Sequence, residues 1–261
     1  MRLIALPAFD DNYLWALADY DGAAVVVDPG DAGPILAAAD AGLRPVTVLI
    51  THHHADHIGG LPAPLERWPS LAIHAPDDAR IADATGRVAD GDRIEALGLT
   101  FETLAVPGHT RSHVAYVCTA PGDADGGLLF CGDTLFSLGC GRLFEGTPAQ
   151  MQASLDRLAA LPGDTRVCCA HEYTASNAVF ALAVDPENAA LRARADAVRA
   201  LRAAGASTLP STIAQERATN PFLRCDTPAI RDATAARLGH PPADRLETFA
   251  ALRAWKDTFR A

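Results

Sequence analysis

The first part of the chain alternates short apolar runs with polar turns. Runs of valine, isoleucine and leucine that end at glycine, proline, asparagine or aspartate are typical of buried strands. The predicted strands cover residues 3–6, 14–17, 23–27, 46–50, 100–106, 127–131 and 166–170. The first two flank Asp10-Asp11-Asn12, a polar turn that predicts a β-hairpin.

Helix signals fall between these strands and dominate the later part of the chain. Residues 34–42 predict a short helix. Thr147-Pro148-Ala149-Gln150 is a capping box with proline at the first helical position, so we expect a helix from there to about Leu161. Further helices are predicted over residues 185–205 and 227–239 and from about Asp244 onward.

The last predicted helix carries an apolar stripe. Its members recur near the helical period: Leu246, Phe249, Leu252, Trp255 and Phe259. We expect the strands to cease near residue 172, which predicts an α/β domain over residues 1–172 and a helical domain over residues 173–261. Strands that alternate with helices favour an α/β fold, a four-layer αββα sandwich, for the first domain.

Residues 51–60, which we call the metal loop, follow the strand at 46–50 directly. They contain four histidines and an aspartate within a few positions. His52 and His54 stand two apart on an extended segment, so both side chains point the same way. Asp56 and His57 follow where the chain must turn. Imidazole and carboxylate groups are the natural ligands of zinc and its divalent neighbours. A solvated histidine-rich loop is the alternative interpretation.

Three later predicted strands show the same pattern, because each is followed closely by a potential metal ligand. His109 follows the strand at 100–106, Asp133 follows the strand at 127–131, and His171 follows the strand at 166–170. A sheet can gather such residues at one edge. The candidate metal ligands are therefore His52, His54, Asp56, His57, His109, Asp133 and His171.

Seven ligands are too many for one tetrahedral zinc ion and suit two ions. The predicted division places His52, His54 and His109 on one ion, Asp56, His57 and His171 on the other, and Asp133 between them. Two ions roughly 3.5–4 Å apart can trap a hydroxide nucleophile, because bound water falls from a pKa of 15.7 towards ~7. Asp56 and Asp133 are also the candidate catalytic residues.

Several further residues near these motifs have two interpretations. Asp28 directly follows the strand at 23–27. The preference of aspartate for turns is enough to explain its presence there, and the alternative is that it accepts a hydrogen bond from the metal loop. We expect His53 to face away from the ligands, and His113 to support a ligand or to belong to the core or surface. His74 and His240 lie outside every motif and are interpreted as structural.

Composition narrows the classes of function. The chain has 261 residues and a net charge of −10, which argues against a nucleic-acid-binding surface and disfavours a membrane role. No apolar stretch approaches the roughly 18 residues of a membrane span. The six cysteines form no C-x-x-C pattern, so we expect buried, reduced thiols. A cytoplasmic monomer acting on a small molecule is the expectation.

Extended motifs point to one superfamily. The segment Thr51-His52-His53-His54-Ala55-Asp56-His57, with Gly108-His109-Thr110 and Gly132-Asp133-Thr134, resembles the metallo-β-lactamase-fold hydrolases. Residues 139–146 (GCGRLFEG) and 218–224 (ATNPFLR) are similar to the bacterial glyoxalase II (hydroxyacylglutathione hydrolase) family. That second resemblance covers essentially the whole chain.

The resemblance implies hydrolysis of S-(2-hydroxyacyl)glutathione, typically S-D-lactoylglutathione, to glutathione and a 2-hydroxy acid such as D-lactate, as in methylglyoxal detoxification. It implies two divalent metal ions, most often zinc, with iron or manganese as alternatives. It also implies that the C-terminal helical domain binds glutathione, and that Arg142, Phe144, Tyr173, Arg253 and Lys256 line the glutathione site. Some family members have lysine and tyrosine at the positions of the first two.

Physical reasoning supports part of this glutathione site. Glutathione carries two carboxylates, so an acidic protein must place cations locally to bind it. Arg253 and Lys256 are three positions apart on the last predicted helix and share a face. Lys256 is the only lysine, and the other 21 cations (22 minus 1) are arginine. Two solvated surface charges are the alternative.

Three other functions compete with thioester hydrolysis. A persulfide dioxygenase of the same fold uses one iron and lacks the complete second ligand set found here. A lactonase or β-lactamase has no need of cations directed at glutathione. A non-enzymatic metal-binding module is disfavoured because seven ligands leave open coordination positions, unlike a structural site.

Overall fold

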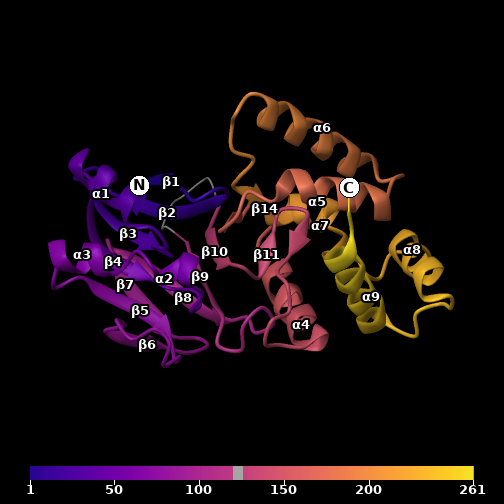
Figure 1. The fold of residues 1–261 in the computed structure, drawn as a ribbon, viewed down its shortest axis with the longest axis horizontal. Coiled ribbons are helices and arrows are strands. Elements are labelled where there is room, and N and C mark those ends of the chain that lie inside the picture. Colours follow the sequence, from indigo (N-terminus) through magenta and orange to yellow (C-terminus); the bar gives the residue numbers. More distant parts are fainter. Residues whose placement is uncertain (120–125, 261) are drawn as a thin grey trace. The chain divides into compact units, whose positions relative to one another are not determined.

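The computed structural model describes residues 1–119 and 126–260, and it divides into two compact units. Unit 1 comprises residues 1–105, 112–132 and 168–171, and unit 2 comprises residues 106–111, 133–167 and 172–261. Figure 1 labels their helices and strands. The units exchange segments along the chain, and the predicted boundary between residues 172 and 173 stays a prediction.

Unit 1 contains a mixed sheet with short helices. The sheet consists of β1 (Arg2–Ala8), β2 (Asn12–Ala18), β3 (Ala23–Val27), β4 (Arg44–Leu49), β5 (Ala72–Pro76) and β6 (Gly86–Val88) in that order. The helices are α1 (Ala32–Asp40), α2 (Ala55–Ile58) and α3 (Pro62–Arg67). β1 and β2 form the predicted hairpin around the Asp10-Asp11 turn. From β3 to β6 the strands are parallel.

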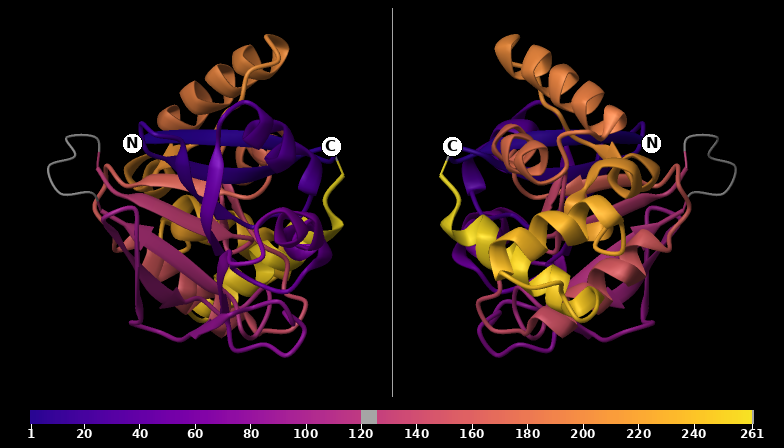
Figure 2. Two further views of the ribbon diagram at one scale, coloured as in Figure 1. Left: turned by 90° about the vertical axis from the view of Figure 1, so that its left-hand side faces the viewer. Right: turned by 90° about the vertical axis from the view of Figure 1, so that its right-hand side faces the viewer.

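A hydrophobic core joins this sheet to its helices. Val26, Val48 and Ile73 of the sheet pack in one cluster with Ile35 of α1 and Leu61, which precedes α3. Figure 2 gives two further views of the ribbon. The β-branched runs therefore form the buried parallel strands that their pattern predicts.

A second sheet of unit 1 contains strands that precede candidate ligands. Its members are β7 (Arg93–Ala96), β8 (Leu99–Ala105), β9 (Val114–Cys118), β10 (Leu128–Gly132) and the end of β13 (Arg166–Cys169), in the order β13-β10-β9-β8-β7. The Tyr116 hydroxyl donates to the Ile50 carbonyl at 2.7 Å, which ties β9 to the end of β4. Within unit 1 the two sheets therefore contact each other at the start of the metal loop.

Unit 2 contains a two-stranded hairpin and most of the helices. Its elements are β11 (Leu135–Phe136), β12 (Gly139–Cys140), α4 (Pro148–Ala159), α5 (Thr174–Val184), α6 (Ala189–Ala203), β14 (Ser211–Thr212), α7 (Ile213–Thr219), the 3-10 helix η1 (Pro221–Leu223), α8 (Pro228–Leu238) and α9 (Arg245–Thr258). α8 and α9 pack side by side (Figure 2, right). On the α9 stripe, Phe249 and Leu252 are fully buried.

Most predicted helices are confirmed, with shifts of a few residues. The capping box at Thr147 forms as expected. The helix predicted from residue 185 is wrong at its start: Asp185 ends α5, and α6 begins only after Asn188, whose side chain accepts from the Leu191 amide. α5 has no polar face because its exposed positions include the apolar residues Ala175, Val179 and Ala183, so helical periodicity could not reveal it.

Strands do not cease at residue 172. Ser211 and Thr212 of β14 pair antiparallel with Val167 and Arg166, and a two-residue strand is too short to show an alternating pattern. All six cysteines are buried thiols, as predicted. Across residues 1–119 and 126–260, every helix is too short or too polar to cross a bilayer.

Side chains from the helices of unit 2 hold the β11–β12 hairpin. The Asn220 amide donates to the carbonyls of Gly139 at 2.9 Å and Phe136 at 3.1 Å. The buried Glu216 carboxylate accepts from the Leu138 amide at 2.8 Å, and Leu138 has a left-handed backbone with φ of 59°. These bonds stabilise a turn that a leucine would not adopt readily.

We expect Asn220→Ala to lower the free energy of unfolding by about 2–4 kcal/mol, because it leaves buried carbonyl groups without their donor. Urea unfolding of the full chain, followed by circular dichroism, measures this loss. Thr147→Ala, which removes the exposed cap of α4, is the matched control and should cost only about 1 kcal/mol. Equal losses in the two variants would contradict the role assigned to Asn220.

Candidate metal centre and adjoining pocket

The metal loop of unit 1 has the geometry that its spacing predicts. His52 Nε2 lies 3.0 Å from His54 Nδ1, so both rings face the same point. Two nitrogens bonded to one ion at about 2.0–2.1 Å stand roughly 2.9–3.4 Å apart, which matches this separation. His54 caps α2, and the helical turn of α2 then redirects Asp56 and His57.

The buried carboxylate of Asp28 organises this loop. Asp28 Oδ1 accepts from the Thr51 amide at 2.7 Å, and Oδ2 accepts from the Thr51 hydroxyl at 2.7 Å. His57 Nδ1 lies 3.0 Å from the same Oδ2. Asp28 itself has a left-handed backbone, with φ of 52°. It therefore does accept hydrogen bonds from the metal loop, which was one of its two interpretations.

A second group in unit 1 consists of Asp56, His57 and His171, whose candidate ligand atoms lie within 4.8 Å of one another. Asp56 Oδ2 is 3.5 Å from His57 Nε2 and 3.4 Å from His171 Nε2. Asn12 donates to Asp56 Oδ2 at 3.1 Å, and Asp11 Oδ1 lies 2.8 Å from His171 Nδ1. The predicted ligands of unit 1 thus lie together.

Asp11 and Asn12 contact candidate ligands, although sequence reasoning interpreted them only as a turn. Asn12 forms an isolated bridge with His171, which brings the hairpin turn to the end of β13. The only available sequence signal was the run of three polar residues in a hairpin, and turns explain such a run without any further role.

Close approach of backbone segments restricts one position of unit 1 to glycine. Gly132, which ends β10, has φ of 47°, and a Cβ there would lie 2.3 Å from the Thr51 hydroxyl. Only glycine combines this conformation with that contact.

In unit 2, His109 and Asp133 form a pair, with His109 Nε2 3.3 Å from Asp133 Oδ2. The His109 Nδ1–H donates to the Arg142 carbonyl at 2.8 Å. The backbone of Gly141 passes so close that a Cβ would lie 1.9 Å from the Asp133 carbonyl oxygen. The strand-end pattern predicted both residues as ligands, and each is buried.

The donor set fits divalent metal ions. In His57, His109 and His171 the Nδ1 atom is engaged by a carboxylate or a carbonyl, so that Nε2 carries the lone pair. His52 Nδ1 lies 3.0 Å from the Thr51 hydroxyl, which in turn donates to Asp28. Ligating histidines in proteins are oriented in this manner. The imidazole and carboxylate groups suit zinc, iron or manganese.

The remaining histidines separate as expected. His53 Nδ1 is directed to Asp78, at 3.6 Å, and His53 is in no ligand cluster. His113 is buried and its ring stacks on that of His52, with centroids 4.6 Å apart, which fits both a core role and support of a candidate ligand. Burial lowers the pKa of His74, whereas His240 is exposed. Neither belongs to a ligand cluster.

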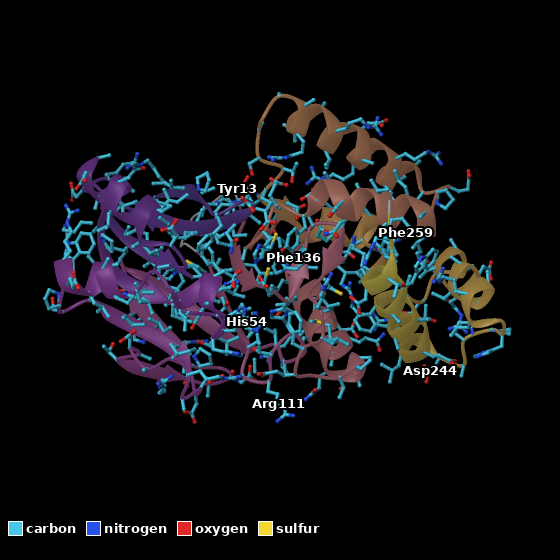
Figure 3. All side chains as sticks on the ribbon, viewed as in Figure 1. Tyr13, His54, Arg111, Phe136, Asp244 and Phe259 are labelled. Carbon is cyan, nitrogen blue, oxygen red and sulfur yellow. The ribbon has the colours of Figure 1, made fainter. Side chains whose placement is uncertain are left out.

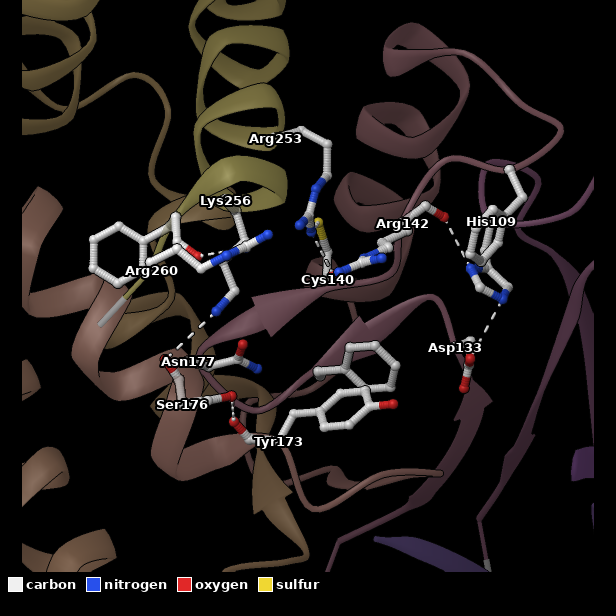
Figure 4. Close-up of a pocket in the computed structure, with 13 residues that line it drawn as sticks. His109, Asp133, Cys140, Arg142, Tyr173, Ser176, Asn177, Arg253, Lys256 and Arg260 are labelled. Carbon is white, nitrogen blue, oxygen red and sulfur yellow. Dashed lines mark hydrogen bonds and ion pairs between the residues drawn. The ribbon is translucent and has the colours of Figure 1, made fainter. Parts of the chain in front are cut away.

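A pocket of ≈ 470 Å³ in unit 2 adjoins the His109–Asp133 pair (Figure 4). All five residues predicted to bind glutathione line it: Arg142, Phe144, Tyr173, Arg253 and Lys256. The residues that sequence reasoning missed are Phe136, Cys140, Ser176, Asn177, Phe259 and Arg260. Figure 3 labels two of them, Phe136 and Phe259, which lie in β11 and just after α9.

The cations of the pocket differ in their surroundings. Arg253 is 5% exposed and donates to the Cys140 carbonyl at 2.8 Å and to Asp257 at 2.9 Å. Arg142 is largely exposed, with Nε 3.9 Å from Asp257. Burial, together with the charges of Arg253 and Arg142, lowers the pKa of Lys256 to about 8.

Two aromatic side chains frame the same pocket. Phe144 is 63% exposed, and its ring meets the His109 ring at a centroid distance of 5.2 Å. Tyr173 precedes α5 and packs edge to face on Phe136, also at 5.2 Å. Aromatic surface therefore lies between the ligand pair and the cations of α9.

Comparison with known proteins assigns the chain to a class. The family model of the metallo-beta-lactamase superfamily matches residues 10–171, and the model described as hydroxyacylglutathione hydrolase C-terminus matches residues 172–259. The crystal structure of ETHE1 from Myxococcus xanthus is similar in fold, with a TM-score of 0.63 and 24% identity over 98% of this chain and 100% of that one. The fold is thus that of the metallo-β-lactamases, as predicted.

Curated relatives narrow the class. A hydroxyacylglutathione hydrolase of Xanthomonas campestris is 58% identical and covers 100% of both chains. One from Xylella fastidiosa is 56% identical over 99% of this chain and 98% of its own length. The chain belongs to the hydroxyacylglutathione hydrolase (glyoxalase II) family, and the predicted family is confirmed.

We expect Asp28→Asn to weaken metal binding by about 10–100-fold, because the amide cannot accept all the hydrogen bonds that orient Thr51 and His57. Competition with a chelator of known affinity measures the change. Asp77→Asn, at an exposed position, is the matched control and should leave the affinity within twofold. An unaltered affinity in Asp28→Asn would limit the role of this carboxylate to folding.

Proposed function

We propose that this protein hydrolyses S-(2-hydroxyacyl)glutathione thioesters, with S-D-lactoylglutathione as the typical substrate, to glutathione and a 2-hydroxy acid such as D-lactate. The observation that carries the proposal is the pocket of unit 2, which combines His109 and Asp133 with four cationic side chains. The full-length relatives named hydroxyacylglutathione hydrolase support the same reaction.

Two divalent metal ions are part of the proposal. His52, His54 and His109 would hold the first ion, Asp56, His57 and His171 would hold the second, and Asp133 would serve both. When bound, such ions supply Lewis acidity and a water molecule of lowered pKa. The engaged Nδ1 atoms of the histidines and the clusters within unit 1 support this assignment. Zinc is the favoured metal, with iron or manganese as alternatives.

The protein's own groups then bind and orient the substrate. Arg142 and Lys256 offer charge to the carboxylates of the glutathione part, and the Tyr173 hydroxyl offers a hydrogen bond. Phe144 lacks the hydroxyl of the tyrosine found in some family members, so it contributes apolar contact alone. Arg253 holds Asp257 and the β12 backbone, and it therefore shapes the cationic wall of the pocket.

The competing functions receive less support. A lactonase substrate has no carboxylates that would require this cationic wall. A persulfide dioxygenase with one iron would not need Asp56, His57 and His171 as a second complete set, yet these three residues cluster in unit 1.

A cytoplasmic location and a monomeric state complete the proposal. Six buried thiols suit a reducing compartment. The net charge of −10 makes binding to nucleic acid or to an anionic membrane unfavourable.

The first experiment is hydrolysis of S-D-lactoylglutathione before and after metal removal, with metal content measured on the same sample. We expect activity to follow about two equivalents of metal. Asp133→Ala should lower kcat at least about 10²-fold, which corresponds to ~3 kcal/mol. Asp164→Ala, at an exposed position of unit 2, is the matched control. Full activity of Asp133→Ala would exclude the proposed bridging role.

Lys256 predicts a pH dependence of substrate capture. Its pKa is lowered to about 8, so the ammonium group is present below that pH and is lost above it. We expect kcat/KM for the glutathione thioester to fall as the pH rises through about 8, since kcat/KM reports groups of the unliganded enzyme. Lys256→Arg keeps its charge throughout this range and should remove the step. A step that persists in Lys256→Arg would have to come from another group.

A further inference from the structure

The cations of the pocket fall into two kinds. Arg253 already has a carboxylate partner, Asp257, and a carbonyl partner, Cys140. Arg142 lies 3.9 Å from the same Asp257 carboxylate. These two guanidinium groups therefore share the one acidic side chain that pairs with them, and part of their charge is neutralised within the protein.

Within residues 1–119 and 126–260, Lys256 and Arg260 donate hydrogen bonds to neutral acceptors. Lys256 Nζ donates to the Ser176 carbonyl at 3.4 Å, and Arg260 Nη1 donates to the Phe259 carbonyl at 3.1 Å. Over residues 1–119 and 126–260, no carboxylate forms an ion pair with either side chain. Figure 4 shows both side chains among the residues that line the pocket.

This grouping is electrostatically unfavourable in the absence of an anion. Like charges that surround a partly enclosed pocket repel one another more strongly than the same charges in open solvent. Arg253 and Arg142 are the cations that act on Lys256. A ligand carboxylate that contacts both Lys256 and Arg260 offsets this positive charge and gains charge-assisted hydrogen bonds from both. Arg260 has four further N–H donors besides the bond to Phe259, and these remain available to an acceptor.

We propose that Arg260, together with Lys256, binds a carboxylate of the glutathione part of the substrate and is a specificity-determining residue of this enzyme. The inference rests on the proposed function and extends it to a residue beyond the five expected from the family resemblance. Arg260 lies immediately past residue 259, where the match to the family model ends.

The test compares two thioesters in Arg260→Ala. S-D-lactoylglutathione carries the carboxylates, whereas S-D-lactoyl-N-acetylcysteamine has the same acyl group on an uncharged thiol. We expect the ratio of the two KM values to change by about 10-fold against the glutathione thioester, the usual effect of losing one charge-assisted hydrogen bond. Arg260→Lys should recover part of that factor, because it restores the charge without the fork of donors.

Arg199→Ala is the matched control, since it removes one exposed arginine of unit 2 that is not among the pocket residues. A KM ratio in Arg260→Ala that equals the ratio in this control would overturn the proposal. Equal losses on both thioesters would overturn it as well, because they would show a structural effect.

A binding measurement separates this inference from the proposed function. If the metal-loaded protein does not hydrolyse S-D-lactoylglutathione, the proposed function fails, and titration calorimetry with S-methylglutathione decides the role of Arg260 alone. Binding that is about 10-fold weaker in Arg260→Ala than in Arg199→Ala would support that role. Equal or undetectable binding in the parent protein and in Arg260→Ala would overturn it.

Discussion

A buried carboxylate holds the metal loop together. It accepts hydrogen bonds from both the backbone and the side chain of Thr51, and it lies beside His57. Asp28 does this from the end of a neighbouring parallel strand. A buried carboxylate is costly unless its oxygens are satisfied, so its position and that of the loop determine each other. The orientation of His52 depends on the same residue, through the hydroxyl of Thr51.

In unit 2, side chains likewise fix the position of a backbone segment, and they include the buried carboxylate of Glu216 and the buried guanidinium of Arg253. The β11–β12 hairpin connects Asp133 to Arg142, and its backbone groups are bonded by Asn220, Glu216 and Arg253. A short hairpin of this kind has few ladder bonds of its own. Side chains from α7, from α9 and from Asn220, which lies between α7 and η1, therefore determine where a candidate ligand and a candidate substrate contact lie.

The candidate ligands could be predicted because each follows a strand directly, and local alternation reveals strands well. Asp11 could not be predicted as a partner of His171, since the contact spans 160 positions and the local pattern of Asp11 is only that of a turn. α5 was missed because the side that it exposes is largely apolar, so the sequence shows no alternation of polar and apolar faces. The position of Arg260 in the pocket could not be predicted, because nothing in the local sequence distinguishes it from an exposed charge.

The pocket contains an amine that can be labelled selectively. Lys256 is the only lysine of the chain, and with a pKa of about 8 roughly a tenth of it is uncharged at pH 7. Acylating reagents attack only uncharged amines. Besides the α-amino group of Met1, they therefore find a single amine target, located inside the pocket. An activated ester could install a fluorophore or mass label there, and protection from labelling would report pocket occupancy without any engineered cysteine.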